Sequence, residues 1–329
     1  MARYLVTGAT GFLGGELVRR LHAEDCNVIA TGRDHTKLSA LPLADKNKLA
    51  LDLSTMEPGD LRQQFNGVTH IIHCAALSSP WGRRTCFERA NVVVTNNVIA
   101  LAKMLQVQHL VHISTPAVYF RFEDQFNIAE DMALPKPVND YARTKAVADG
   151  HVLASGLPYT IIRPRGIYGA GDNALLPRLL RAAKTGALPR FRRGRAVTDV
   201  THVSDVVEAI LSVMRQPAQA IGRIFNISGG EALPISQIVD QAAAASGIVP
   251  RWRDLPVMPV LVAVRAGELA ARLHPARPEP SVTAYGLGIF AFSQTLDLSN
   301  ARHHLNWRPK VSFPEGLKLT FSANRPGAR

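Results

Sequence analysis

A tyrosine and a lysine stand four residues apart, at Tyr141 and Lys145. On a helix this spacing places both side chains on one face. A nearby ammonium group stabilises a phenolate, so we expect Lys145 to lower the pKa of Tyr141 and make it a usable proton donor and acceptor. Such pairs are common by chance, but this one opens the helix after Ile113–Tyr119, which carries the hydroxyls of Ser114 and Thr115. The end of that predicted strand faces the crevice where open α/β sheets bind ligands.

A glycine-rich turn lies near the start of the chain. Gly8, Gly11 and Gly14 are three residues apart and join an apolar run to the helical pattern Phe12–Ala23. The first glycine permits a tight turn, the second lets the backbone approach a pyrophosphate, and the third lets helix and strand pack closely. Free N–H groups at the helix start favour an anion. The turn therefore predicts a dinucleotide cofactor. The predicted contacts in the turn also include Thr10, Phe12 and Leu13.

The end of the second predicted strand bears on the choice of cofactor. NAD sites usually carry an acid there for the ribose 2′-hydroxyl, whereas this chain has Gly32 followed by Arg33. The Arg33 guanidinium could hold a 2′-phosphate, although Asp34 could instead pair with it on the surface. We therefore predict NADP(H), with NAD(H) as the alternative. Asp52 and Leu53, at the third strand end, are further cofactor candidates, because the carboxylate could meet the adenine amino group or simply cap the strand.

Short β-branched runs alternate with longer helical patterns in the first half of the chain. The predicted strands are Tyr4–Thr7, Val28–Thr31, Leu49–Leu53, His70–Cys74, Leu110–Ser114 and Tyr159–Ile162. The predicted helices are Phe12–Ala23, Cys86–Gln106 and Tyr141–Ser155. Since parallel strands need crossover helices, this order predicts an α/β fold with a doubly wound parallel (Rossmann-type) sheet.

The second half is less regular and predicts a different role. Its clearest elements are a helix at Asp205–Met214, a strand at Ile224–Ile227 and a helix at Ile235–Ala245. We assign residues 1–165 to a dinucleotide-binding domain and residues 166–329 to a smaller substrate-binding lobe, from which strands and helices can return to the first domain.

Composition limits the classes of protein that the chain can represent. The three cysteines lack metal-ligand spacing, so we expect reduced thiols, no metal and a cytoplasmic location. The apolar run Val257–Val264 falls short of the roughly 20 residues of a spanning helix, so no transmembrane segment is predicted. The net charge of +12 is compatible with nucleic acid, an anionic membrane or an acidic ligand. No nucleic-acid module is recognisable, so we expect a small-molecule substrate. The basic stretch Arg178–Arg195 is interpreted as a solvated helix face and loop, with binding of a diphosphate or carboxylate as the alternative.

Taken together, these segments resemble the extended short-chain dehydrogenase/reductase family over nearly the whole chain. The segments that carry the resemblance are Thr7–Gly14, His73–Ala76, Asn91–Val92, Ser114–Tyr119, Tyr141–Lys145, Arg163–Pro164, Ile167–Gly169 and His202–Asp205. The resemblance implies that Tyr141 is the proton donor, that Lys145 holds the nicotinamide ribose, and that Thr115 orients the carbonyl, with Ser114 as the fallback.

The same resemblance implies further contacts and an oligomer. Asn91 is similar to the family's asparagine that supports the central helix and a proton-relay water, with an ordinary polar helix residue as the alternative. Ala75, Ala76 and Pro164 are expected to contact the cofactor. Members of the family commonly pair helices of two subunits in a four-helix interface, so the resemblance implies a homodimer.

Other segments indicate the branch of the family. Pro116–Ala117 supply no acid or base where 4,6-dehydratases carry an Asp-Glu pair. Val197–Val203 and Ser78–Gly82 resemble the 3β-hydroxysteroid dehydrogenase, sterol-carboxylate dehydrogenase and 2-alkyl-3-oxoalkanoate reductase branch. Ser78 and Trp81 are therefore candidate substrate contacts, although Trp81 could simply be a packed loop aromatic. The apolar segment Leu255–Ala271 predicts either a core helix of the small lobe or a flexible wall over a hydrophobic substrate.

These observations favour an NADP(H)-dependent oxidoreductase. The hydride would move between the nicotinamide and a bulky apolar ketone or secondary alcohol, with a steroid-like or 3-oxo-acid-like frame. The first alternative is a sugar-nucleotide epimerase that uses the same tyrosine and lysine. A second alternative is a non-catalytic NADP-sensing or RNA-associated binding protein, against which the intact Tyr141, Lys145 and Thr115 argue.

Overall fold

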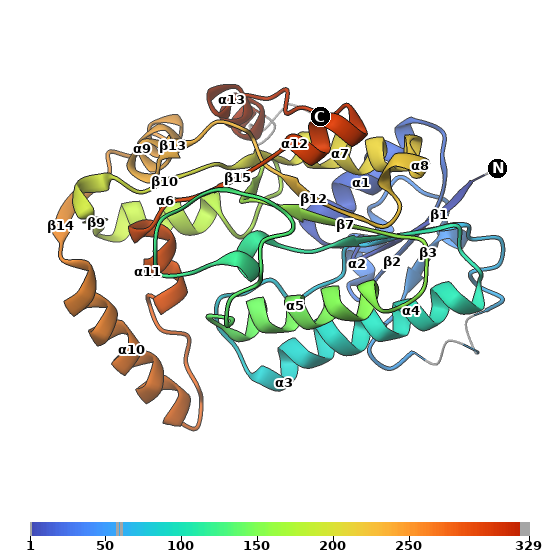
Figure 1. The fold of residues 1–329 in the computed structure, drawn as a ribbon, viewed down its shortest axis with the longest axis horizontal. Coiled ribbons are helices and arrows are strands. Elements are labelled where there is room, and N and C mark those ends of the chain that lie inside the picture. Colours follow the sequence, from blue (N-terminus) through green and yellow to red (C-terminus); the bar gives the residue numbers. More distant parts are fainter. Residues whose placement is uncertain (1, 57–58, 60–61, 323–329) are drawn as a thin grey trace.

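A seven-stranded parallel sheet forms the centre of the protein in the computed structural model, which describes residues 2–56, 59 and 62–322 (Figure 1). The strand order is β12-β7-β5-β4-β1-β2-β3, and every neighbouring pair is parallel. These strands are β1 (Arg3–Thr7), β2 (Asn27–Gly32), β3 (Lys48–Ala50), β4 (His70–His73), β5 (His109–Ile113), β7 (Tyr159–Pro164) and β12 (Arg223–Ile227). The predicted doubly wound α/β fold is confirmed.

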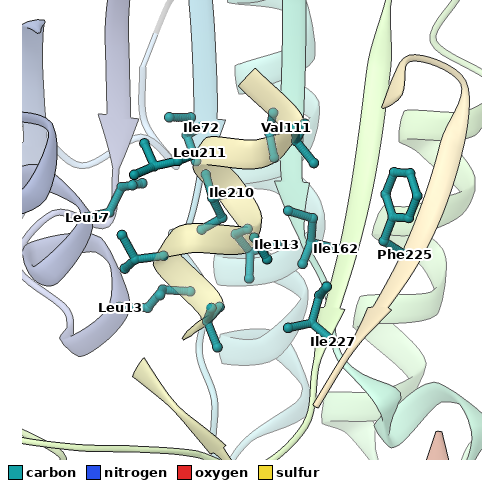
Figure 2. Close-up of a cluster of buried hydrophobic side chains, with 14 of the residues drawn as sticks. Leu13, Leu17, Ile72, Val111, Ile113, Ile162, Ile210, Leu211, Phe225 and Ile227 are labelled. Carbon is teal, nitrogen blue, oxygen red and sulfur yellow. The ribbon is translucent and has the colours of Figure 1, made fainter. Parts of the chain in front are cut away.

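Helices cover both faces of this sheet. Helices α1 (Phe12–Ala23) and α7 (Val203–Arg215) pack on one face, and α4 (Val94–Met104) and α5 (Asp140–Leu153) cover the other. Successive strand residues serve opposite faces, because strand side chains alternate: Ile72 packs in the α1/α7 core and Ile71 in the α4 core. Figure 2 shows Ile72, Val111 and Ile162 from the sheet pointing toward Ile210 and Leu211 of α7.

Two elements from the second half return to the sheet. Strand β12 pairs with β7 from Arg223 to Ile227, and α7 covers the adjoining face. The side of α7 that meets the sheet is apolar. In Figure 2, Phe225 and Ile227 project from β12 into the same cluster. The division of the chain at residues 165 and 166 stays a prediction.

Two local predictions differ from the structure. The third strand, predicted to reach Leu53, ends at Ala50, because the Asp52 carboxylate accepts hydrogen bonds from the Ser54 amide (3.0 Å) and hydroxyl (2.7 Å) and turns the chain. The helix predicted over Cys86–Gln106 is a continuous helical segment in three parts: α3 (Arg84–Phe87), a π-helical segment (Glu88–Val93) and α4.

The lobe beside the sheet is built from short elements. Its strands form a four-stranded sheet, β13 (Leu233–Pro234), β10 (Val197–Thr198), β15 (Gln294–Leu296) and β6 (Gln125–Ile128), and two pairs, β8 (Ile167–Tyr168) with β11 (Thr201–His202) and β9 (Ala187–Phe191) with β14 (Arg251–Leu255). The remaining α-helices described are α2 (His35–Ser39), α6 (Leu176–Thr185), α8 (Pro217–Ala220), α9 (Ile235–Ala245), α10 (Val257–Leu273), α11 (Ala284–Ala291), α12 (Ser299–Leu305) and α13 (Phe313–Ser322). Short 3-10 helices lie at Asp45–Asn47, Pro116–Tyr119 and Arg192–Gly194.

Helix α10 is not the core helix that its apolar sequence suggests. It extends from the body of the protein at the lower left of Figure 1, and only Leu261 among its 17 residues is buried. One stripe packs on α11 and the opposite side faces solvent, since no second layer covers it within the described residues. None of the helices described has both the length and the apolar character needed to cross a membrane.

Candidate active site

The glycine turn forms a cradle that side chains would fill. Gly8 has a φ of +67°, and a Cβ there would lie 2.7 Å from the backbone of Ala75; a Cβ on Gly14 would overlap the Gly8 carbonyl oxygen. Gly11 begins α1 without a side-chain cap, so amide groups at the helix start are left for a ligand. Backbone amides at a helix start and a backbone surface without side chains suit a pyrophosphate. These residues therefore fit a dinucleotide cofactor.

The end of β2 carries an exposed arginine. Arg33 has no ion pair within residues 2–56, 59 and 62–322. Asp34 does not pair with Arg33. Its carboxylate caps α2 by accepting a hydrogen bond from the Lys37 amide (3.1 Å), and it lies 3.4 Å from the Lys37 ammonium. A Cβ on Gly32 would come within 2.6 Å of the Thr10 side chain. Packing thus excludes a larger residue at position 32 unless Thr10 moves.

Asp52 is occupied by protein groups. Besides the Ser54 contacts, its carboxylate pairs with Arg89 at 3.1 Å. The hydrogen bonds from Ser54, with the charges of Arg89 and Arg33, lower its pKa. Of the two roles considered for Asp52, the structure displays the turn-forming one. Leu53 is buried in the core, and its carbonyl accepts a hydrogen bond from Asn97.

Tyr141 lies at the start of α5, beside two hydroxyl groups. Asn139 caps the helix by accepting a hydrogen bond from the Ala142 amide at 2.8 Å, which fixes the first turn. The hydroxyls of Thr115 and Ser78 lie close enough to the Tyr141 phenol to affect its pKa. Ser114, in contrast, has a buried hydroxyl with no hydrogen-bond partner among the described residues. The structure therefore brings Thr115, Ser78 and Tyr141 together.

The expectation that Lys145 lowers the pKa of Tyr141 is wrong for this structure. Burial raises the pKa of Tyr141 and outweighs the opposing hydrogen bonds from Thr115 and Ser78. The Lys145 ammonium points elsewhere: it donates to the Ile113 carbonyl at 2.8 Å and lies 3.1 Å from His112 Nε2. Burial also lowers the pKa of Lys145 to about 8.

A buried polar network lies behind Lys145. His112 Nε2 lies 3.5 Å from Oδ1 of Asp149. The other oxygen of that carboxylate accepts hydrogen bonds from Arg163 at 2.8 and 3.2 Å. Arg163 in turn donates to the hydroxyl of Tyr119 at 2.5 Å. Burial alone would raise the pKa of Asp149, but His112, Arg163 and Lys145 hold it at about 2. Buried charges must be paired to be tolerated, so this network fixes the position of Lys145.

Asn91 connects the loop before α3 to the catalytic helix. Its side-chain oxygen accepts a hydrogen bond from the Leu77 amide at 2.7 Å, and its amide donates to the Leu77 carbonyl and to the Thr144 hydroxyl. The residue is buried in the π-helical segment. Asn91 therefore positions the loop that carries Ser78 relative to the helix that carries Tyr141.

The remaining residues singled out in the sequence have contacts of their own. The Ala75 amide donates to Thr7, Ala76 follows it, and Pro164 ends β7. Trp81 is half-buried, and its indole N–H donates to the Arg277 carbonyl at 3.4 Å, as a packed loop aromatic would. His202 and Asp205 are structural, since His202 caps α7 and Asp205 accepts hydrogen bonds from the amides of residues 310 and 311.

The sequence carries no motif for two residues near Tyr141. Tyr285, from α11, lies close enough to Tyr141 and Arg165 for their charges to affect its pKa, which burial raises to about 12. Arg165 is buried and donates to Thr198 at 3.1 and 2.8 Å and to Gln294. These bonds use three of its five N–H donors, and no carboxylate among the described residues lies within ion-pair distance. Neither residue is close to Tyr141 in sequence, so their proximity to it in the fold could not be predicted from a local pattern.

A cavity of about 620 Å³ lies between α6, β9 and α11. Its walls include Leu188, Phe191, Leu287 and Phe290, with Pro80 of the Ser78–Gly82 loop at one side. Thr283 and Gly286, which flank Tyr285 closely in sequence, also line it. The cavity is thus a largely apolar space in the lobe, and Pro80 connects it to the loop that carries Ser78.

The basic stretch Arg178–Arg195 serves mainly to hold the lobe. Arg190 pairs with Asp254 at 2.7 Å and ties β9 to β14, while Arg192 pairs with Asp124 at 2.6 Å. Arg178 lies 3.8 Å from Glu279. This arrangement agrees with the interpretation as a solvated face and loop.

Known proteins resemble this chain in fold and in sequence. Residues 4–228 match the NAD dependent epimerase/dehydratase family. A 2-alkyl-3-oxoalkanoate reductase from Stenotrophomonas maltophilia is 32% identical, covering 96% of this chain and 97% of its own. A decarboxylating sterol-4-alpha-carboxylate 3-dehydrogenase from Schizosaccharomyces pombe is 27% identical, covering 98% and 97%. A UDP-glucuronic acid 4-epimerase from Bacillus cereus, solved with NAD, has a TM-score of 0.75 at 21% identity and 97% coverage of both chains. With a family match over more than half its length, the chain is an enzyme and belongs to the NAD-dependent epimerase/dehydratase family, within the extended short-chain dehydrogenases/reductases.

Proposed function

We propose that this enzyme is an NADP(H)-dependent oxidoreductase of bulky apolar ketones or secondary alcohols with a 3-oxo-acid-like or steroid-like frame. The cavity between α6 and α11 carries this proposal, because its apolar walls would gain free energy from contact with alkyl surface. The reductase and the sterol dehydrogenase among the relatives support it, since their names describe an oxo acid and a sterol carboxylate.

Arg33 supports NADP(H) as the preferred cofactor. The guanidinium is exposed at the strand end where the adenosine ribose binds in this fold, and it forms no ion pair in the described part of the chain. A 2′-phosphate would supply the missing anion through charge-assisted hydrogen bonds.

The proposed catalytic roles follow from the groups around Tyr141. The bound nicotinamide supplies or accepts the hydride. Tyr141 stays protonated across the neutral range because burial raises its pKa, so it can donate a proton to the carbonyl oxygen during reduction. Thr115 and Ser78 orient that oxygen with their hydroxyls, and Lys145 contributes positive charge near the ribose.

Arg165 supports the oxo-acid form of the substrate. It is a buried cation whose hydrogen bonds to Thr198 and Gln294 leave two N–H donors, Asp199 acts on it by charge but not within ion-pair distance among the described residues, and Tyr285 lies close to both it and Tyr141. A substrate carboxylate would accept hydrogen bonds from the two remaining N–H donors of Arg165. This contact would hold the adjacent ketone near the Tyr141 phenol.

NADPH oxidation measured with a substrate panel tests this function. We expect turnover of long-chain 2-alkyl-3-oxo acids, weaker turnover of their methyl esters, and none of UDP-glucose or UDP-glucuronic acid. Arg165→Gln should erase the preference for acid over ester, whereas Arg165→Lys should retain part of it. Turnover of a UDP-sugar with no turnover of ketones would replace the proposal with the epimerase alternative.

Two further properties are proposed. The exposed apolar side chains of Val147 and Leu153 on α5, with Val93 just before α4, support a homodimer formed by these helices. We also retain a cytoplasmic location as a proposal, supported by three free thiols.

A further inference from the structure

Helix α10 presents two apolar faces, of which the protein covers one. Its inner stripe, including Val260, Leu261 and Val264, packs against α11. The outer stripe is exposed: Met258 (65%), Val262 (63%), Leu269 (60%) and Leu273 (78%) are four, seven and four residues apart, which places them on one side of the helix. A helix that is apolar all round is normally covered all round, so this outer stripe indicates a surface that covers it.

The end of α10 adds a cluster of cations. A cavity of about 400 Å³ there is lined by Arg83, Arg84, Arg272, His274 and Arg277. Arg84 pairs with Glu88 at 2.9 Å, but the other three arginines have no acidic partner within residues 2–56, 59 and 62–322. A partner that covers the apolar stripe must therefore also present negative charge at this end.

We propose that α10 and its basic end dock the protein on the surface of an anionic lipid bilayer. An interfacial helix inserts its apolar face at the boundary between headgroups and acyl chains while nearby arginines attract acidic lipids. A second copy of the chain fits less well, because its own α10 would bring a second set of the same arginines to the contact rather than negative charge. This proposal rests on α10 and its basic end and does not depend on the proposed function.

The location of the helix adds a consequence for apolar ligands. The segment after α10 supplies Glu279, Pro280 and Val282 to the wall of the 620 Å³ cavity, and α11 beneath α10 supplies Leu287 and Phe290. A bilayer against α10 would therefore lie beside the cavity, so a ligand soluble in lipid could enter it from the membrane.

Co-sedimentation of the full chain with vesicles tests the docking. We expect binding to vesicles of equal parts phosphatidylcholine and phosphatidylglycerol, and little binding to phosphatidylcholine alone. The double variant Val262→Asp/Leu269→Asp should bind at least ten-fold more weakly. The matched control Val249→Asp/Leu319→Asp changes apolar residues exposed on other surfaces and should bind like wild type. Arg83→Gln and Arg277→Gln should each weaken binding by about five-fold, and salt should weaken it further.

Three results would overturn the proposal. They are absence of wild-type binding to the anionic vesicles, equal loss of binding in the control variant, and a change of oligomeric state in the α10 variant by sedimentation velocity. The last result would show that a second copy covers the helix. Circular dichroism of each variant confirms that it is folded, and NADPH binding provides a readout that the docking surface should not affect.

Discussion

Behind Tyr141 the protein buries charge, whereas between α6 and α11 it encloses apolar space. In the first region, Lys145, Asp149 and Arg163 are all buried and are tied together by short contacts. In the second, Leu188, Leu287 and Phe290 surround a cavity, and charged side chains such as Arg178 and Glu279 pair with each other. The contrast indicates a division of labour: the first region sets the chemistry for any substrate, and the second sets which substrate enters.

The largest effect is expected from Tyr141→Phe in the first region. Because the ring without its hydroxyl cannot donate a proton, kcat should fall by about 10²–10⁴-fold or more on every substrate. Cofactor binding, measured by fluorescence titration, should be unchanged. A normal kcat on the best substrate would remove Tyr141 from the proton-donor role.

A smaller and more selective effect is expected from Arg33→Ala. Loss of a charge-assisted contact to the 2′-phosphate should weaken NADPH binding by about 1.5–3 kcal/mol and leave NADH binding nearly unchanged. Calorimetric titration of both cofactors checks this, with Arg19→Ala as a control at an exposed arginine on α1. Wild-type protein that binds NADH more tightly than NADPH would contradict the assignment.

The pH dependence of reduction should report Lys145. Its pKa is lowered from 10.5 to about 8, so its positive charge is lost as the pH rises through that value. If the charged form is active, kcat/KM should fall above about pH 8. Lys145→Arg keeps its charge at high pH, so in that variant the decline should move to higher pH. A decline at the same pH in both proteins would assign it to another group.

The sequence predicted much of the first region and little of the second. The helices Phe12–Ala23 and Ile235–Ala245 were predicted with the bounds observed, because their apolar periodicity and flanking glycine or proline are local signals. The association of Tyr141 with Thr115 followed from strand-end geometry in a parallel sheet. The partners of Lys145 did not, since His112, Asp149 and Arg163 come from separate elements and carry no common motif.

The apolar segment at α10 shows a second limit. Its composition predicted either a core helix or a wall over a hydrophobic substrate. A core helix requires a neighbouring layer on each side, and composition does not state whether one exists. Tyr285 and Arg165 illustrate the same point for the site: their proximity to Tyr141 depends on how the lobe folds back on the sheet. Patterns with a fixed period are therefore predictable from this sequence, whereas contacts between distant segments are not.

The smallest expected effect is the dependence of kcat/KM on alkyl chain length. This dependence shows whether the cavity between α6 and α11 selects an apolar substrate. In the wild type each added methylene should contribute about 0.8 kcal/mol, or roughly four-fold, until the cavity is full. Phe290→Ala, which alters the cavity wall, should change this slope, while Phe126→Ala, an exposed residue of β6, should leave it intact. We expect a slope that depends on Phe290 and holds for NADPH-dependent reduction. A flat dependence on chain length in the wild type, with saturable turnover of a UDP-sugar, would contradict it.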